Sequence, residues 1–175
     1  MPCAFVVMSG MTTHSKNTMK VRETLWYILQ DAHFGDDPQD ISLYRILNAI
    51  SRATHKAGMN TERLNQLYDE VRPLIYNYTT GPRYSEDEWV SAYILHINRN
   101  KFKPLYYKLC KIDREIISLC ETLYVLDTDS GDTEGEIAEI ADITRKLLDK
   151  THKLKCKRKN ILSEVETLAT QLLTC

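Results

Sequence analysis

Basic side chains concentrate in two separate stretches of this chain, and the first of them also contains Phe102, Tyr106 and Tyr107. From Arg99 to Lys111 there are five bases and no acid, and from Arg145 to Lys159 there are eight bases and one acid, Asp149. Lysines with tyrosines between them are typical of surfaces that neutralise phosphates and stack on single-stranded or looped RNA. The candidate residues for binding RNA or another anion are Lys101, Lys103, Tyr106, Tyr107, Lys108, Lys111, Lys153, Lys155, Lys157, Arg158 and Lys159. The alternative is an ordinary solvated helix face, with Tyr106 packed on the stem of Lys155.

Two short patterns resemble metal sites but lack part of the ligand set. His152 and Cys156 are one helical turn apart, and Cys110 falls near them across the predicted hairpin, but no fourth zinc ligand is present. The acidic turn that begins at Asp127 has its glycine at the fifth position and Ala138 at the twelfth, which does not fit a calcium loop. We predict no metal site. Ser130, flanked by acids, is a candidate for phosphorylation in a solvated turn.

Enzyme signatures are missing from the sequence. There is no glycine-rich phosphate loop, no nucleophile elbow and no paired-histidine metal motif. We therefore predict a protein that is not an enzyme, with no catalytic residue, no cofactor and no small-molecule substrate. A cytosolic enzyme whose site forms only by spatial convergence is a third hypothesis.

Composition indicates a soluble globular protein, with 43% hydrophobic and 27% charged residues. The formal net charge of −1 gives no global attraction to nucleic acid or to an anionic membrane, so any such attraction needs a local patch. The five cysteines are odd in number and scattered, and no secretory leader accompanies them. This pattern favours reduced thiols in the cytoplasm or nucleus of a eukaryotic or viral system. No apolar run has the length of a membrane span.

The basic stretches belong to a segment that we expect to fold as an antiparallel helical hairpin. Apolar residues recur alternately three and four positions apart on both sides of the acidic, glycine-containing turn at 127–136, which is an a/d heptad seam. The first arm has Leu105, Leu109, Ile112, Ile116, Leu119, Leu123 and Leu126 in this seam. The second arm continues with Ile137, Ile140, Thr144, Leu147, Thr151, Leu154, Arg158, Ile161, Val165, Leu168 and Leu172.

The predicted register pairs Leu126 with Ile137 at the tip and Leu105 with Arg158 at the root. It also places Lys108 opposite Lys157, so the hairpin has an acidic tip and a basic root. Like charges that face each other cost stability, which favours an anionic partner at the root.

The N-terminal half predicts four further helices and no convincing strand. The first runs from about Thr18 to His33, the second from Pro38 to Gly58, the third from Asn60 or Thr61, and the fourth follows a capping box at 85–88. Pro73 is expected to kink the third helix or to end it near Val71. The fold class is all-α: a helical bundle with a long C-terminal coiled-coil-like hairpin. We expect a flexible tail at 1–16, a helical subdomain at 17–98, and the hairpin at 99–175, which starts at Pro104 after a break at 98–103.

The second arm has more apolar surface than a two-helix seam requires. Ile161, Val165, Leu168 and Leu172 extend beyond the start of the first arm, so they must pack on the N-terminal helices or on a second chain. Polar seam residues such as Thr144 and Thr151 characteristically specify register and partner number. We therefore predict a helical protein–protein interaction module that self-associates, as a dimer, and RNA binding is the alternative function.

Overall fold

A computed structural model describes residues 13–58, 61–75, 83–128 and 133–174, and side chains from residue 19 onward in the first of these ranges. The predicted all-α fold is confirmed, because these residues form helices and no strand. The helices are α1 (Thr13–Phe34), α2 (Pro38–Ala57), α3 (Glu62–Ile75), α4 (Glu86–Ile97), α5 (Arg99–Thr128) and α6 (Glu134–Thr174). The predicted tail at 1–16 and the phosphorylation candidate Ser130 fall largely or wholly outside the described residues.

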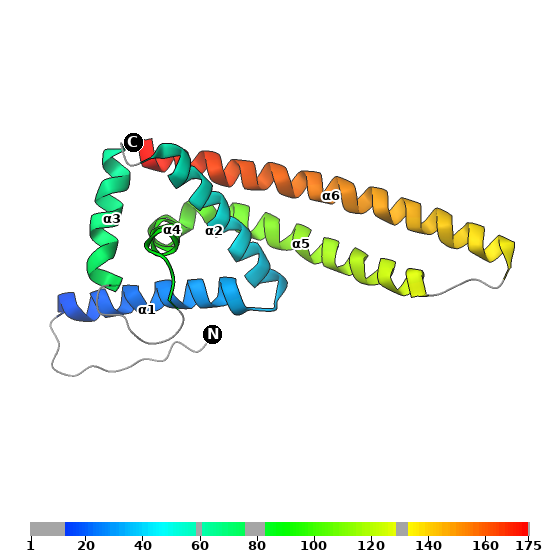
Figure 1. The fold of residues 1–175 in the computed structure, drawn as a ribbon, viewed down its shortest axis with the longest axis horizontal. Coiled ribbons are helices and arrows are strands. Elements are labelled where there is room, and N and C mark those ends of the chain that lie inside the picture. The colour runs from blue at the N-terminus through cyan, green and yellow to red at the C-terminus, as the bar shows by residue number, and fades with distance from the viewer. Residues whose placement is uncertain (1–12, 59–60, 76–82, 129–132, 175) are drawn as a thin grey trace.

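A bundle of α1 to α4 forms one end of the molecule, and the hairpin of α5 and α6 projects from it (Figure 1). The core of this bundle contains fully buried side chains from both halves of the chain, such as Leu25, Ile50, Phe102 and Val165. Because Phe102 and Val165 belong to the hairpin, its root is part of the same core as α1 and α2. The division into subdomains at residue 98 stays a prediction.

Local signals place several helix ends where the sequence predicts them. The Ser85 hydroxyl accepts a hydrogen bond from the backbone N–H of Glu88, and the Glu88 carboxylate accepts one from the N–H of Ser85, which is the predicted capping box of α4. Gly58 ends α2 with a φ of 67°, a left-handed conformation that glycine adopts without strain. α1 begins at Thr13, five residues before the predicted start, because no apolar periodicity marks that first turn.

The predicted break at 98–103 is wrong, since α5 begins at Arg99 and contains Pro104. Only Asn98 separates α4 from α5, and its carbonyl accepts bonds from the N–H groups of Lys101 and Phe102. Pro104 removes one backbone hydrogen bond near the helix start. Burial of Phe102, worth about 1.5–3 kcal/mol, offsets that loss. In the same way Pro73 lies inside α3, which continues to Ile75.

The two arms of the hairpin pack along their length, with α6 the longer arm. At 1.5 Å per residue α5 is about 45 Å long and α6 about 60 Å long. The C-terminal part of α6 therefore reaches past the start of α5, and there it packs on α2 and α3. Among the seam residues Leu109, Ile116, Thr151 and Leu154 are buried, whereas Ile137 at the tip is exposed. The layer-by-layer register stays a prediction.

Candidate functional site

The C-terminal seam residues pack inside the chain. Ile161 and Val165 are buried, and Leu168 and Leu172 are half-buried against the core. The sequence allowed these residues to pack either on the N-terminal helices or on a second chain, and in the structure they pack on the N-terminal helices.

Next to these residues the Glu166 carboxylate forms ion pairs with Lys56 and Arg52 of α2, the latter with Oε2 and Nε 3.4 Å apart. The hydrogen bond from Lys56 and the two positive charges lower the pKa of Glu166. The side of α6 that carries Glu166 therefore faces α2.

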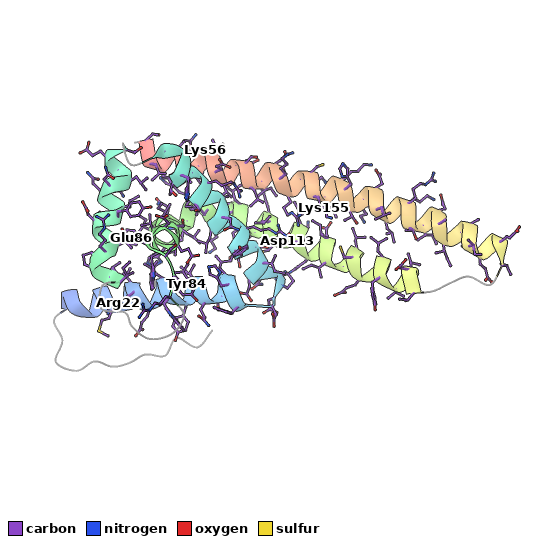
Figure 2. The ribbon with its side chains drawn as sticks, in the orientation of Figure 1. Arg22, Lys56, Tyr84, Glu86, Asp113 and Lys155 are labelled. Carbon is purple, nitrogen blue, oxygen red and sulfur yellow. The ribbon has the colours of Figure 1, made fainter. Side chains whose placement is uncertain are left out.

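A buried polar cluster joins α2 to both arms of the hairpin. Asp113 of α5 is only 2% exposed, and it accepts a 2.8 Å hydrogen bond from the Ser42 hydroxyl. Arg158 of α6 donates to Asp113 Oδ1 at 3.3 Å, and the Nε of Arg45 lies 3.7 Å from the same oxygen. Burial and the nearby charge of Arg158 lower the pKa of Arg45, whereas Asp113 acts in the opposite direction. In Figure 2 Asp113 lies where α2 crosses the hairpin.

This cluster accounts for one of the predicted anion-binding residues. The guanidinium of Arg158 is turned toward Asp113 inside the chain, which also explains why an arginine occupies a seam position. Sequence reasoning missed the cluster, because Asp113 lies outside the seam and nothing in the sequence shows that α2 crosses there.

Helical geometry assigns the remaining residues to faces of the hairpin. At 3.6 residues per turn, two residues roughly 18 apart lie on the same side of a helix and two residues roughly 9 apart on opposite sides. Tyr106 and Glu166 mark the side that faces α2, because the Tyr106 hydroxyl donates to the backbone oxygen of Gln39 at 3.4 Å and Glu166 pairs with Arg52. We call this side of the hairpin, marked by these two residues, the α2-side face.

An apolar strip continues the α2-side face toward the tip, beyond the residues that contact α2. Tyr124 is 18 residues after Tyr106 and is 72% exposed, and Leu148 is 18 residues before Glu166 and is 53% exposed. Residues 4, 7 or 11 positions apart on a helix also lie on the same side. This spacing from Tyr124 and Leu148 adds Ile117, Ile137 and Ala141 to the same face. The apolar strip consists of Ile117, Tyr124, Ile137, Ala141 and Leu148.

Lysines occupy the opposite face of the hairpin. Lys157 is nine residues before Glu166, and Lys108 and Lys111 are two and five residues after Tyr106, which puts all three on the side away from α2. The same helical periodicity places further lysines of α5 and α6 on this side of the hairpin. The lysine face consists of Lys101, Lys108 and Lys111 on α5 and of Lys146, Lys150, Lys153 and Lys157 on α6, and all of them are exposed.

The structure thus separates the predicted anion-binding residues into several groups. Lys101, Lys108, Lys111, Lys153 and Lys157 are on the lysine face, whereas Tyr106, Lys155 and Lys159 are on the α2-side face. Lys103 and Tyr107 lie between these faces, with the lysine Nζ 5.7 Å from the centre of the tyrosine ring. The sequence prediction left out Lys146 and Lys150, although they lie seven and three residues before Lys153, a helical spacing that could have found them.

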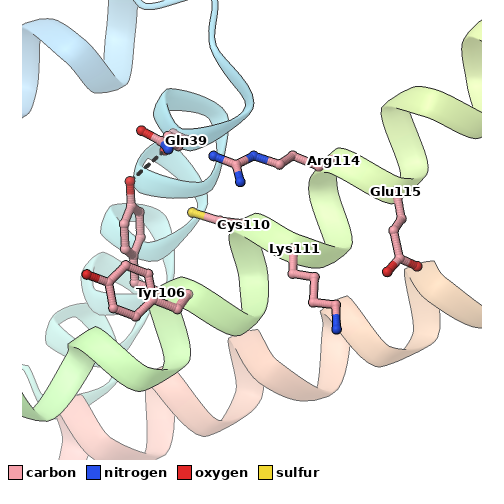
Figure 3. Close-up of a pocket in the computed structure, with 7 residues that line it drawn as sticks. Gln39, Tyr106, Cys110, Lys111, Arg114 and Glu115 are labelled. Carbon is pink, nitrogen blue, oxygen red and sulfur yellow. Dashed lines mark hydrogen bonds between the residues drawn. The ribbon is translucent and has the colours of Figure 1, made fainter.

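A cavity of about 620 Å³ opens where Gln39 of α2 meets α5. In Figure 3 the Arg114 guanidinium points toward Gln39 and lies near the Cys110 sulfur, whereas the Lys111 side chain points away from Gln39. Burial, followed by the hydrogen bond with Cys110, raises the pKa of Tyr106, so its hydroxyl stays neutral and donates to Gln39. The lining residues include no histidine, and we assign no reaction to this cavity.

The residues considered as zinc ligands do not converge. His152 Nε2 and Cys156 Sγ are 3.7 Å apart on the exposed surface of α6, whereas Cys110 is buried beside Tyr106. Within the described ranges no three His, Cys, Asp or Glu side chains form a group that could hold a metal ion. No helix in that part of the chain is long and apolar enough to cross a membrane.

Comparison with protein-family models, curated proteins and solved structures yields no match for this chain.

Proposed function

We propose that this protein is a non-enzymatic helical interaction module that self-associates through the apolar strip of its hairpin. The observation that supports this proposal is the uncovered continuation of the α2-side face, on which Tyr124 and Leu148 are more than half exposed. Near the root, the same face of the hairpin already packs against a helix of its own chain. A helix of a second copy has the shape and the apolar surface to occupy the rest of it.

Burial of the apolar strip supplies enough free energy for a dimer. Each large apolar side chain contributes roughly 1.5–3 kcal/mol when it is fully buried. In a symmetric dimer every strip residue is buried twice, once on each copy, which offsets the cost of association. Because the strip includes side chains from both arms, the hairpin of a second copy forms a four-helix arrangement with it.

Charge favours an antiparallel arrangement of the two hairpins. Asp127 and Glu134 lie at the tip end of the apolar strip, whereas Arg114 and Lys155 lie at the end near α2. An antiparallel pair brings the acidic tip of each copy to the basic end of the other, and a parallel pair brings the two acidic tips together. The second copy is therefore the occupant that best complements this face.

The test compares two neighbouring substitutions by sedimentation velocity over a range of protein concentrations. Tyr124→Glu places a charge in the apolar strip, whereas Val125→Glu places the same charge one residue away, on a different side of α5, where Val125 is 62% exposed. We expect the wild type and Val125→Glu to dimerise and Tyr124→Glu to remain monomeric. Circular dichroism checks that both variants keep their helix content.

Two results would contradict self-association through this strip. One is a wild-type protein that remains monomeric at every concentration, and the other is an equal shift of the monomer–dimer equilibrium by both substitutions.

The alternative function that the sequence predicts, RNA binding, needs a surface for anions. The lysine face on the other side of the hairpin is the observation that favours it.

A further inference from the structure

The lysine face is long enough to follow several phosphates of a nucleic acid. From Lys146 to Lys157 the row on α6 measures about 16 Å at 1.5 Å per residue, and the row on α5 from Lys101 to Lys111 measures about 15 Å. The axes of packed helices are about 8–10 Å apart, so the two rows flank one shallow band. This band lies on the side of the hairpin away from α2.

Few acids neutralise the lysines of this band. Lys146 pairs with Asp142 at 2.9 Å and Lys153 pairs with Asp149 at 3.1 Å, both as exposed pairs on the same helix. Helical spacing puts Glu115 within the lysine face and Glu139 and Glu164 at its two ends. Positive charge therefore dominates between the ends, where Lys108, Lys111, Lys150 and Lys157 form no ion pair with any residue that the structure describes. Exposed lysine pairs are weak enough to be exchanged for phosphate contacts.

The side chains on this face determine which feature of a nucleic acid they can read. Lysine binds phosphate as a point charge, without the paired donors that arginine offers to base edges. The tyrosines that the sequence suggested for base stacking do not belong to the face, because Tyr106 is turned toward Gln39 and Tyr107 lies under Lys103. The geometry therefore suits contacts with the backbone and provides no residue for stacking on bases.

We infer that the lysine face binds the phosphodiester backbone of nucleic acid without sequence preference, through Lys108, Lys111, Lys150, Lys153 and Lys157. This binding does not depend on self-association, because the apolar strip lies on the opposite side of the hairpin. A dimer formed through the apolar strips has its two lysine faces on the outside, where both are open to the polymer.

The experiment is a fluorescence-anisotropy titration of the full chain with labelled single-stranded RNA, double-stranded RNA and double-stranded DNA. With four or five lysine–phosphate contacts on a duplex, affinity should fall on the order of a hundredfold between about 50 and 200 mM salt. Scrambling the base sequence should leave the affinity unchanged. The three polymers identify which form of the backbone fits the face best.

The chain offers a matched control outside the lysine face. Lys150→Glu with Lys157→Glu reverses two charges on the lysine face, and Lys103→Glu with Lys159→Glu reverses two charges outside it. Both double variants change the net charge by the same amount, and all four residues are exposed, so both are expected to fold. We expect the first variant to lose at least about tenfold in affinity and to lower the salt slope by about two contacts. The second should lose less than about threefold through the change in net charge alone.

Three outcomes would overturn the inference: no binding to any of the three polymers at the lower salt concentration, binding that does not respond to salt, and equal losses in the two double variants. A monomeric wild type that binds with these properties would refute the proposed self-association and leave the lysine face in place.

Discussion

Replacement of Asp113 should destabilise the whole fold, because this carboxylate holds α2 against both arms of the hairpin. It is 2% exposed and contacts Ser42, Arg45 and Arg158. Asp113→Ala leaves two guanidinium groups close together without their counter-charge and one hydroxyl without its acceptor. The loss of one partner from a buried ion pair typically costs about 3–5 kcal/mol.

Because the two arginines are partly exposed to water, we expect the loss of stability on replacing Asp113 to be smaller than this. The side chain of Arg45 is 35% exposed and that of Arg158 is 18% exposed, so water replaces part of the lost interaction. We expect Asp113→Ala to reduce the free energy of unfolding by about 2–4 kcal/mol. Asp113→Asn keeps the shape and one acceptor, and its cost should be smaller.

Urea denaturation followed by circular dichroism measures this change as a shift of the midpoint at constant slope. Glu115→Ala, two residues further along the same helix at an exposed position, is the control and should stay within about 0.5 kcal/mol of the wild type. A change below about 1 kcal/mol for Asp113→Ala would refute the structural role of the cluster, since exposed ion pairs already have that strength. A double-mutant cycle with Arg158→Ala separates the pair from the rest of the cluster.

Three further predictions concern the attachment of α6 and the helix ends. The pKa of Glu166 is lowered by Lys56, so its ion pairs stabilise the fold at neutral pH, and this contribution is lost as pH falls through the lowered pKa. Glu166→Gln should therefore cost up to about 1 kcal/mol at pH 7, and urea unfolding over a series of acidic pH values should show this cost shrinking as pH falls through that pKa. Leu173→Ala should cost about 2–5 kcal/mol in the same assay, although it is close to the C-terminus, because Leu173 is fully buried; a cost below about 1 kcal/mol would contradict its place in the core. Gly58→Ala should lower the thermal midpoint, since alanine in a left-handed conformation costs about 1–2 kcal/mol. Gly135→Ala in the first turn of α6 should raise the thermal midpoint, because alanine favours a helix more than glycine does. Shifts of the same sign in the two variants would contradict this difference.

Local signals in the sequence predicted most of the fold. The reciprocal bonds of Ser85 and Glu88 begin α4, and Gly58 ends α2, because both signals act within one helical turn. The seam predicted the hairpin because two arms with the same spacing can bury each other. Pro104 misled the prediction of the start of α5, since burial of Phe102 in the bundle is a tertiary effect that no local pattern shows.

The candidate surfaces were harder to predict, because which residues share an exposed face depends on which other helices pack against the hairpin. The sequence grouped Lys155 and Lys159 with Lys157 as members of one basic stretch. The contact of Glu166 with Arg52 shows which side of α6 is turned to α2, and only then does helical spacing separate these lysines. The same contact shows that Leu148 lies on the α2-side face, which α2 covers near the root of the hairpin.

The position of α2 therefore accounts for both proposals. Because α2 crosses the hairpin near its root, at Asp113 and Glu166, it leaves the apolar strip exposed toward the tip, and most of the lysine face lies on the side away from α2. Tyr124 and Leu148, which are more than half exposed, add little to the stability of the isolated chain, and adjacent lysines reduce its stability. A chain that needed only a stable bundle could replace these residues by polar or oppositely charged ones at no cost to its core. Their presence on opposite faces fits the two proposed partners, and we expect Tyr124→Glu to abolish self-association alone and the double variant of Lys150 and Lys157 to weaken nucleic-acid binding alone.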